Sequence, residues 1–250
     1  MPSDPNTPPP QVWDLSAPRG ANPLRSLEEH SHEVYCVAYN LARRDCFLSA
    51  SWDDTAKLWS LAGPPRALRT FAEHGYCVYG VAWNPSAGDV FATASGDCTV
   101  KLWDARQAFS AATLPAHGYE VLAVDWNKYN DALIATGSVD KTARVWDVRA
   151  PGAPLATLAG HAYAVRRVRW SPFQGSVLYT ASYDMTVAAW DTARCAGPGG
   201  PGEPLLRRWD HHTEFAVGLD ASALVDGLLA STGWDEAVHV WHAAGDPRDG

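Results

Sequence analysis

The chain has 250 residues, of which 46% are hydrophobic and 19% are charged, a composition typical of a chain that buries a core. Its net charge is −8 and no block of Lys or Arg stands out, which argues against a nucleic-acid-binding surface and favours basic partners. No apolar run approaches the ~20 residues that a membrane-spanning helix needs, so the sequence predicts no membrane insertion.

The N-terminal segment is polar and carries five prolines between Met1 and Pro10. Such a composition is typical neither of a signal peptide nor of a helix, and it predicts disorder over residues 1–11. The stretch Val12-Trp13-Asp14 then has the pattern of the end of a strand. We therefore expect the folded domain to occupy residues 12–250.

One motif recurs through the rest of the chain and accounts for much of its content of 12 Trp. Each copy places an Asp six residues before a Trp, and these aspartates are separated by 44, 43, 44 and 51 residues. They are Asp53, Asp97, Asp140, Asp184 and Asp235, and upstream histidines recur with them at His30, His74, His117, His161 and His211. A period of about 40–45 residues ending in Trp-Asp predicts four-stranded blades, and hence an all-β propeller with about five blade units.

Strand patterns fill each unit. In the second unit Val78–Trp83, Val90–Ser95 and Thr99–Trp103 are the expected strands, and Gly96-Asp97 supplies a tight turn. Weaker fourth strands are expected in each unit, for example over 67–71 and 155–158, and no segment shows helical periodicity. The Gly/Pro-rich stretch 196–204 lengthens the last step and predicts an inserted loop.

The repeated Ser, His and Asp could suggest a hydrolase, but four equivalent copies along one rim and the absence of a G-x-S-x-G elbow argue against catalysis. We expect instead that His and Asp pair inside each blade, with the hydrogen bonds continuing through a Ser to the indole N–H of Trp. The serines expected in this role are Ser51, Ser95, Ser138 and Ser182. The expected pairs are His74 with Asp97, His117 with Asp140, and His161 with Asp184. The fifth set should be the weakest, because Gly233 replaces Ser and Ala237 replaces Thr.

The sequence predicts neither a metal site nor a cofactor. Its five cysteines form no C-x-x-C pair and no paired framework, which is typical of reduced thiols in a cytosolic compartment. With no catalytic residue identified either, the chain is expected to be a binding protein and not an enzyme.

Several segments differ from a generic blade consensus, among them 47–55, 88–99, 125–129, 163–169, 210–220 and 229–236. On these residues the chain resembles the receptor for the type-2 peroxisomal targeting signal, the peroxin-7 family of Trp-Asp-repeat propellers. The resemblance implies a seven-bladed ring, of which this chain would lack the first blade and most of the second. It also implies a cargo receptor for N-terminal type-2 signals, shared between the cytosol and the peroxisome matrix. The implied partners are such cargo proteins and a co-receptor for C-terminal peroxisomal signals.

Residues next to the turn Asp and after the blade His are expected to share one face of the propeller. Aromatic anchors with interspersed carboxylates would suit an amphipathic cargo helix that carries basic residues. The expected face comprises Trp52, Tyr183, Trp234, Glu33, Tyr35, Tyr79, Glu120 and Glu214. The alternative is that the aromatic residues only pack neighbouring blades together.

Other binding functions remain open at this point. Trp103-Asp-Ala-Arg106 and Trp146-Asp-Val-Arg149 match the W-D-x-R box of substrate adaptors for cullin-type ubiquitin ligases. A general Trp-Asp-repeat scaffold is a further alternative, because one fold serves many functions.

Overall fold

A computed structural model describes residues 9–195 and 202–245. Their regular structure consists of strands and two short 3₁₀ helices, so the predicted all-β class is confirmed. The chain divides into two compact units, residues 1–113 and residues 114–250. Neither helix is long and apolar enough to cross a membrane.

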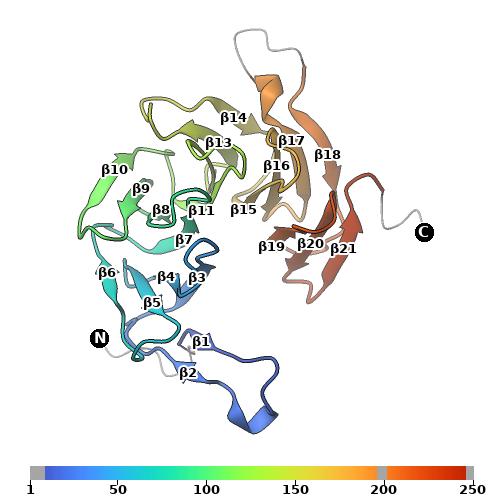
Figure 1. Cartoon of the computed structure of the whole chain (residues 1–250). Helices are drawn as coiled ribbons and strands as arrows, with labels where there is room; N and C mark the ends of the chain where they lie inside the picture. The colour runs from blue at the N-terminus through green and yellow to red at the C-terminus, as the bar shows by residue number, and fades with distance from the viewer. Residues whose placement is uncertain (1–8, 196–201, 246–250) are drawn as a thin grey trace. The chain divides into compact units, whose positions relative to one another are not determined.

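The first unit holds a two-stranded sheet and two four-stranded antiparallel blades (Figure 1). The small sheet pairs β1 (Gln11–Val12) with β2 (Arg25–Ser26), and the helix η1 (Arg19–Ala21) lies between them in sequence. The first blade has strands β3 (Val34–Tyr39), β4 (Cys46–Ser51), β5 (Ala56–Ser60) and β6 (Arg69–Phe71). The second has β7 (Val78–Trp83), β8 (Val90–Ser95), β9 (Val100–Asp104) and β10 (Ser110–Leu114), whose last residue passes the boundary of the unit.

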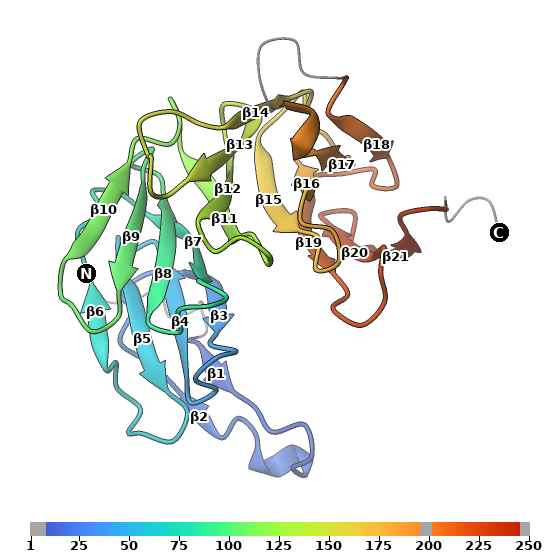
Figure 2. The same cartoon turned by 45° about the horizontal axis from the view of Figure 1, so that its top comes forward.

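The second unit holds three blades, whose strands lie side by side in order in each sheet (Figure 2). The third blade has β11 (Val121–Trp126), β12 (Leu133–Ser138), β13 (Thr142–Asp147) and β14 (Ala156–Ala159). The fourth has β15 (Val165–Trp170), β16 (Val177–Ser182), β17 (Val187–Asp191) and β18 (Leu205–Trp209), with η2 (Thr192–Cys195) following β17. The fifth has three strands within the described residues: β19 (Ala216–Ala221), β20 (Leu228–Gly233) and β21 (Val238–His242).

Two local features repeat in all five blades. The residue after the turn Asp has a positive φ of 60–71°, at Asp54, Cys98, Lys141, Met185 and Glu236. This left-handed residue closes the turn between the second and third strands. The first strand carries a β-bulge near its start, because its register shifts by one residue against the second strand. A bulge redirects the extra side chain, and here the extra residues include Tyr35 and Tyr79.

The repeated Trp of each blade is buried in a hydrophobic core. In the first unit one hydrophobic cluster joins the first two blades through residues such as Leu48, Phe71, Phe91 and Trp103. Phe71 lies with its ring 4.8 Å from that of Phe91 and 5.2 Å from that of Trp103. The fourth strand of the first blade therefore packs against the second blade, which explains why consecutive blades within a unit stabilise each other.

Trp13 is the exception among the repeated tryptophans. Its neighbour Val12 ends β1, which pairs with β2 as a third strand pairs with a fourth in the complete blades. Yet Trp13 is 56% exposed, whereas Trp59 is fully buried. Within the described residues β1 and β2 form a sheet without inner strands, so nothing on that sheet covers the Trp13 indole.

Two predicted segments fall largely outside the described residues. The expected disorder over residues 1–11 concerns mostly residues 1–8, and Gln11 already belongs to β1. The expected Gly/Pro-rich loop 196–204 includes residues 196–201, and only its end, which leads into β18, is described.

Candidate functional site

The repeated His and Asp come together in every blade. The distance from His Nδ1 to the nearer Asp carboxylate oxygen is 2.7 Å for His74–Asp97 and 2.8 Å for both His117–Asp140 and His161–Asp184. His30 and Asp53 form the same pair at 2.7 Å. These histidine side chains are at most 2% exposed, so each pair is an internal contact of its own blade.

A hydroxyl group links each of these histidines to the blade Trp. In the second blade Thr93 Oγ1 lies 2.6 Å from His74 Nε2 and 2.9 Å from Trp103 Nε1. The hydroxyls in this position are Ser49, Thr93, Thr136 and Thr180. The sequence prediction that Ser51, Ser95, Ser138 and Ser182 make this link was wrong.

Strand geometry explains the correction. Trp103 lies directly opposite Phe91 on the neighbouring strand, so its indole reaches the same-face neighbour two residues further on, Thr93. Ser95 lies four residues from Phe91, about 13 Å along the strand, and is out of reach. Ser95 instead donates to the carbonyl oxygen of Tyr76 at 2.8 Å and accepts the Asp97 N–H at 3.1 Å.

In the fifth blade the paired histidine is His212, and the predicted His211 was wrong. His212 Nδ1 lies 2.9 Å from Asp235 Oδ2, and its Nε2 lies 2.7 Å from Ser231 Oγ. The signal was present in the sequence, because His precedes its Asp by 23 residues in the other four blades and only His212 keeps that spacing. The set is incomplete as expected: Ala237 offers no hydroxyl, and Trp241 Nε1 has no hydrogen-bond partner among the described residues.

The turn carboxylates are strongly stabilised in their charged form. Burial opposes ionisation of Asp97, but hydrogen bonds from His74 and Thr99 outweigh it and hold its pKa well below the usual range. Asp53 and Asp184 have lowered pKa values for the same combination of causes. Each carboxylate is therefore ionised and held by hydrogen bonds within its turn.

The chain Asp53–His30–Ser49 resembles a hydrolase triad in its connectivity. Ser49, however, is fully buried, and it also accepts the Trp59 N–H at 2.8 Å. A nucleophile must meet substrate beside an oxyanion hole, and these hydroxyls meet only their own blade. Burial also raises the pKa of the Cys46 thiol to about 11, which leaves it protonated and unreactive.

Three of the predicted face residues form an aromatic cluster in the first unit. The Tyr35 ring stacks on Trp52 at 5.1 Å between centroids, and Tyr79 meets Tyr35 edge-on at 5.4 Å. The bulges of β3 and β7 supply the two tyrosines, and the Trp52 N–H bonds the Glu33 carbonyl oxygen at 3.0 Å. Trp52 stays 37% exposed, so this cluster, which we call the Trp52 cluster, presents aromatic surface to solvent.

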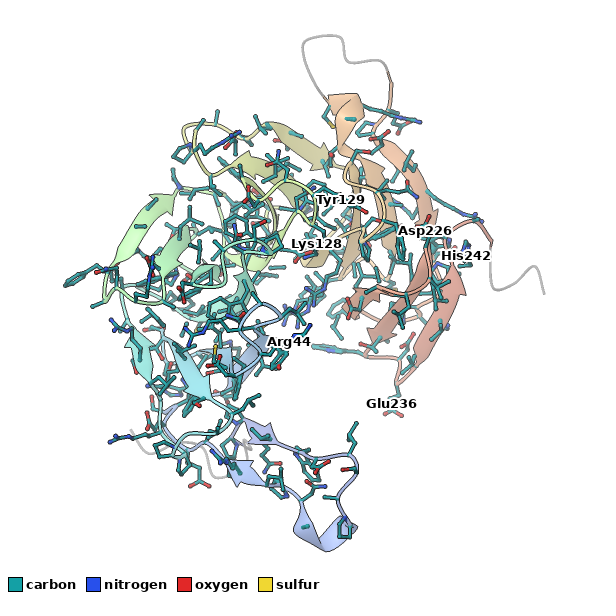
Figure 3. The ribbon with its side chains drawn as sticks, in the orientation of Figure 1. Arg44, Lys128, Tyr129, Asp226, Glu236 and His242 are labelled. Carbon is teal, nitrogen blue, oxygen red and sulfur yellow. The ribbon has the colours of Figure 1, made fainter. Side chains whose placement is uncertain are left out.

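A second aromatic cluster lies in the fourth and fifth blades. Phe215 lies with its ring centroid 4.8 Å from that of Tyr183 and 5.1 Å from that of Trp234. Trp234 is 64% exposed and Tyr183 is half-buried. We call these three residues the Trp234 cluster. Figure 3 labels Glu236, in the same turn as Trp234, at one end of the fifth blade, and Asp226 and His242 at its other end.

The predicted carboxylates occupy different surroundings. Glu214 is exposed next to Phe215 in sequence, and Glu33 is half-buried and tied by its backbone to Trp52. Glu120 is half-buried, and its carbonyl oxygen accepts the N–H of Val139, the third-blade counterpart of Trp52. An aromatic cluster with an adjacent carboxylate thus occurs in each unit, while Glu120 lies beside an aliphatic residue.

Comparison with known proteins identifies the family to which this architecture belongs. Residues 21–60, 65–104, 109–147 and 152–191 match the family model described as WD domain, G-beta repeat. The chain is 56% identical over 240 residues to peroxisome biogenesis protein 7 of Arabidopsis thaliana, a match that covers 95% of this chain and 73% of that protein. A segment of 50 residues is 49% identical to the peroxisomal targeting signal 2 receptor of Dictyostelium discoideum, covering 20% of this chain and 16% of that protein. A segment of 38 residues is 45% identical to the receptor of that name in Saccharomyces cerevisiae, covering 15% of this chain and 10% of that protein.

Proposed function

The chain belongs to the peroxin-7 family of WD-repeat proteins, the peroxisomal targeting signal 2 receptors, and from this we infer that it is a cargo receptor. It binds proteins that carry an N-terminal type-2 targeting signal and serves their import into the peroxisome matrix. The observation that carries this proposal is the 56% identity over 95% of the chain to peroxisome biogenesis protein 7. The buried hydroxyls of the repeated polar sets support a binding role without catalysis.

We propose that the Trp52 cluster and the Trp234 cluster receive apolar side chains of the signal. Exposed indole rings that neighbouring aromatic rings hold in place can bury a large area at little cost in conformational entropy. Glu33, Glu120 and Glu214 would meet the basic residues of the signal. Since exposed ion pairs contribute only about 0.2–1 kcal/mol each, the carboxylates would set orientation while aromatic burial supplies most of the affinity.

The same proposal extends to partners and location. A receptor for an import signal meets its cargo in the cytosol and accompanies it to the peroxisome, so we assign this chain to the cytosol and the peroxisome matrix. We further propose that a co-receptor for C-terminal peroxisomal signals acts with it on the cargo. No cofactor is required, because recognition of a peptide needs only the side chains described.

The W-D-x-R boxes give no support to the ligase-adaptor alternative. Arg106 bonds Asp104 through Nε and Nη2 at 2.9 and 2.6 Å, and Arg149 bonds Asp147 at the same distances. These bonds from Arg lower the pKa of each Asp to about 2. Each box is thus explained as an internal pair that orders the end of the third strand. A general scaffold is likewise unsupported by any particular contact.

The test is capture of a synthetic type-2 signal peptide by the immobilised chain, with the co-receptor added. We expect Trp52→Ala and Trp234→Ala each to weaken capture at least tenfold, because each removes the largest exposed ring of its cluster. Tyr183→Ala should act in the same direction, and Glu120→Lys should weaken it by repelling basic residues.

Matched controls are Phe109→Ala in the first unit and Tyr129→Ala in the second. Both rings are highly exposed, at 76% and 62%, and belong to neither cluster. If the unaltered chain ignores the peptide with the co-receptor present, the receptor proposal fails. If it captures the peptide and all the cluster variants match the controls, the receptor proposal stands and the assigned residues are wrong.

A further inference from the structure

The fifth blade departs from the other four around its turn carboxylate. In those blades a Thr hydroxyl lies 2.6–2.7 Å from the turn Asp, whereas Ala237 occupies that position here. Gly233 replaces the usual Ser, and a Cβ at Gly233 would lie 2.5 Å from His212 Nδ1 and 2.6 Å from Asp235 Oδ1. The pair can occupy its observed position only because Gly233 has no side chain.

A second histidine enters the space beside this pair. The His239 ring lies 4.7 Å from the His212 ring between centroids, nearly perpendicular to it. His239 is directly opposite Ser231 on the neighbouring strand, and Ser231 is the residue that bonds His212 Nε2. The strand β21, the turn before it and the loop before β19 therefore bring one donor atom each of His212, Asp235 and His239 within 4.8 Å of one another.

The equivalent positions in the other blades do not offer this donor. Lys57 and Lys101 donate to Thr70 and Thr113 of their fourth strands, each at 3.0 Å, and Arg144 donates to the Ala116 carbonyl oxygen at 2.9 Å. The fourth blade has Ala188 there. Of the five His–Asp pairs, only that of the fifth blade has a third metal-ligating side chain within reach among the described residues.

We propose that His212, Asp235 and His239 form a zinc-binding site. Two imidazole nitrogens and one carboxylate oxygen are a donor set that Zn²⁺ takes in proteins, at bond lengths of about 2.0–2.2 Å. Ligand atoms of a tetrahedral ion then lie about 3.4 Å apart. His212 Nδ1 is already near that separation from the two Asp235 oxygens, at 2.9 and 3.1 Å, and His239 must approach by up to about 1.4 Å.

The surroundings allow both that approach and entry of the ion. His239 and Asp235 are half-buried, and His239 lies on β21, the outermost strand of the fifth sheet within the described residues. Ser231 holds His212 through Nε2, which orients the ring and leaves Nδ1 to face the ion. A water molecule would complete a fourth position. Binding requires neutral imidazoles, so it must weaken as the pH falls.

The sequence offered no sign of this site. Sequence spacing predicts no metal here, because His212 and His239 are 27 residues apart and form no short ligand motif. Only the fold brings the three donors together.

The experiment titrates Zn²⁺ into the whole chain by calorimetry, after treatment with chelator and in the presence of a non-coordinating reductant. Co²⁺ serves as a spectroscopic probe of coordination. We expect one equivalent to bind, with intense visible absorption from a four-coordinate Co²⁺ complex. His239→Ala should weaken binding more than about 100-fold, since even a residue that only orients a ligand contributes 10–100-fold.

Two further variants complete the design. His242→Ala is the matched control, because His242 is exposed on the same strand and its Nδ1 accepts only the Ala244 N–H. Ala237→Thr restores the hydroxyl that competes for Asp235 in the other blades, and it should weaken zinc binding while the chain stays folded. Circular dichroism of each variant without metal checks folding.

Binding that His239→Ala leaves unchanged would place the ion elsewhere, on the cysteines for example, and overturn the proposal. Absence of binding at 1 mM Zn²⁺ would overturn it as well. The proposal is supported only if the loss is specific to His239→Ala and Ala237→Thr and spares His242→Ala.

Discussion

Thr93 occupies the centre of the repeated polar set in the second blade. With Nδ1 of His74 donating to Asp97, Nε2 is the acceptor, so the Thr93 hydroxyl donates to His74 and accepts the Trp103 N–H. Its side chain is fully buried. One hydroxyl thus satisfies two buried groups, and its removal leaves both without a partner.

We expect Thr93→Val to lower the free energy of unfolding by about 2–6 kcal/mol, because two buried polar groups lose their hydrogen bonds at about 1–3 kcal/mol each. Urea unfolding followed by tryptophan fluorescence measures this loss. The control is Thr113→Val in the same unit, where an exposed hydroxyl accepts one bond from Lys101. Equal losses in the two variants would contradict a central role for Thr93.

Single residues show where the sequence was sufficient and where it was not. The pairing partners of four aspartates follow from a constant spacing of 23 residues, and the same spacing identifies His212 once it is applied strictly. The register of two strands decides which hydroxyl accepts the Trp N–H. The motif Ser-x-Asp indicates a different hydroxyl, that of the Ser, and this was wrong. His239 carries no local signal at all.

The turns between the second and third strands carry five carboxylates with lowered pKa values. Each has a lower pKa in the folded chain than in the unfolded one, where an Asp titrates near pH 3.9. The stabilisation is therefore complete above about pH 5 and is lost as the pH falls through 4 towards the folded pKa. The turns make the fold sensitive to acid.

We measure the free energy of unfolding with urea and expect the contribution of the turn carboxylates to change little between pH 7 and pH 5. Below pH 4 the free energy of unfolding should fall steeply. Asp140→Asn should flatten part of this acid dependence, because one titrating turn carboxylate is removed. Asp131→Asn is the control, since Asp131 is exposed. A wild-type acid slope that stays the same in Asp140→Asn would show that the turns are not the cause.

The strands whose two faces are both largely buried were predicted best. The inner strands β7 and β8 begin and end where alternation and turn residues predict, and β9 is displaced by one residue. The fourth strands were predicted less well: β6 begins at Arg69 and not at residue 67. A fourth strand such as β6 leaves more of its residues exposed than a first strand such as β7 does, so its sequence pattern is weaker.

Each of the two compact units has hydrophobic clusters of its own. Phe71, 1% exposed, belongs to a cluster whose buried members all lie between residues 46 and 105. Leu178, fully buried, belongs to one whose buried members all lie between residues 123 and 190. In arrays of repeats stability is close to a sum of blade and neighbour contributions, so damage to one cluster should stay near that cluster.

We therefore expect Phe71→Ala and Leu178→Ala each to raise amide hydrogen exchange, measured by mass spectrometry, in a different part of the chain. Each substitution leaves a cavity that costs about 2–5 kcal/mol. Phe71→Ala should raise exchange mainly in β4–β9, and Leu178→Ala mainly in β11–β17. Leu68→Ala, at a residue that is 52% exposed, should raise exchange in neither region. Uniform acceleration over all described strands by either core variant would mean that the chain unfolds as one cooperative unit, and the prediction of local damage would be wrong.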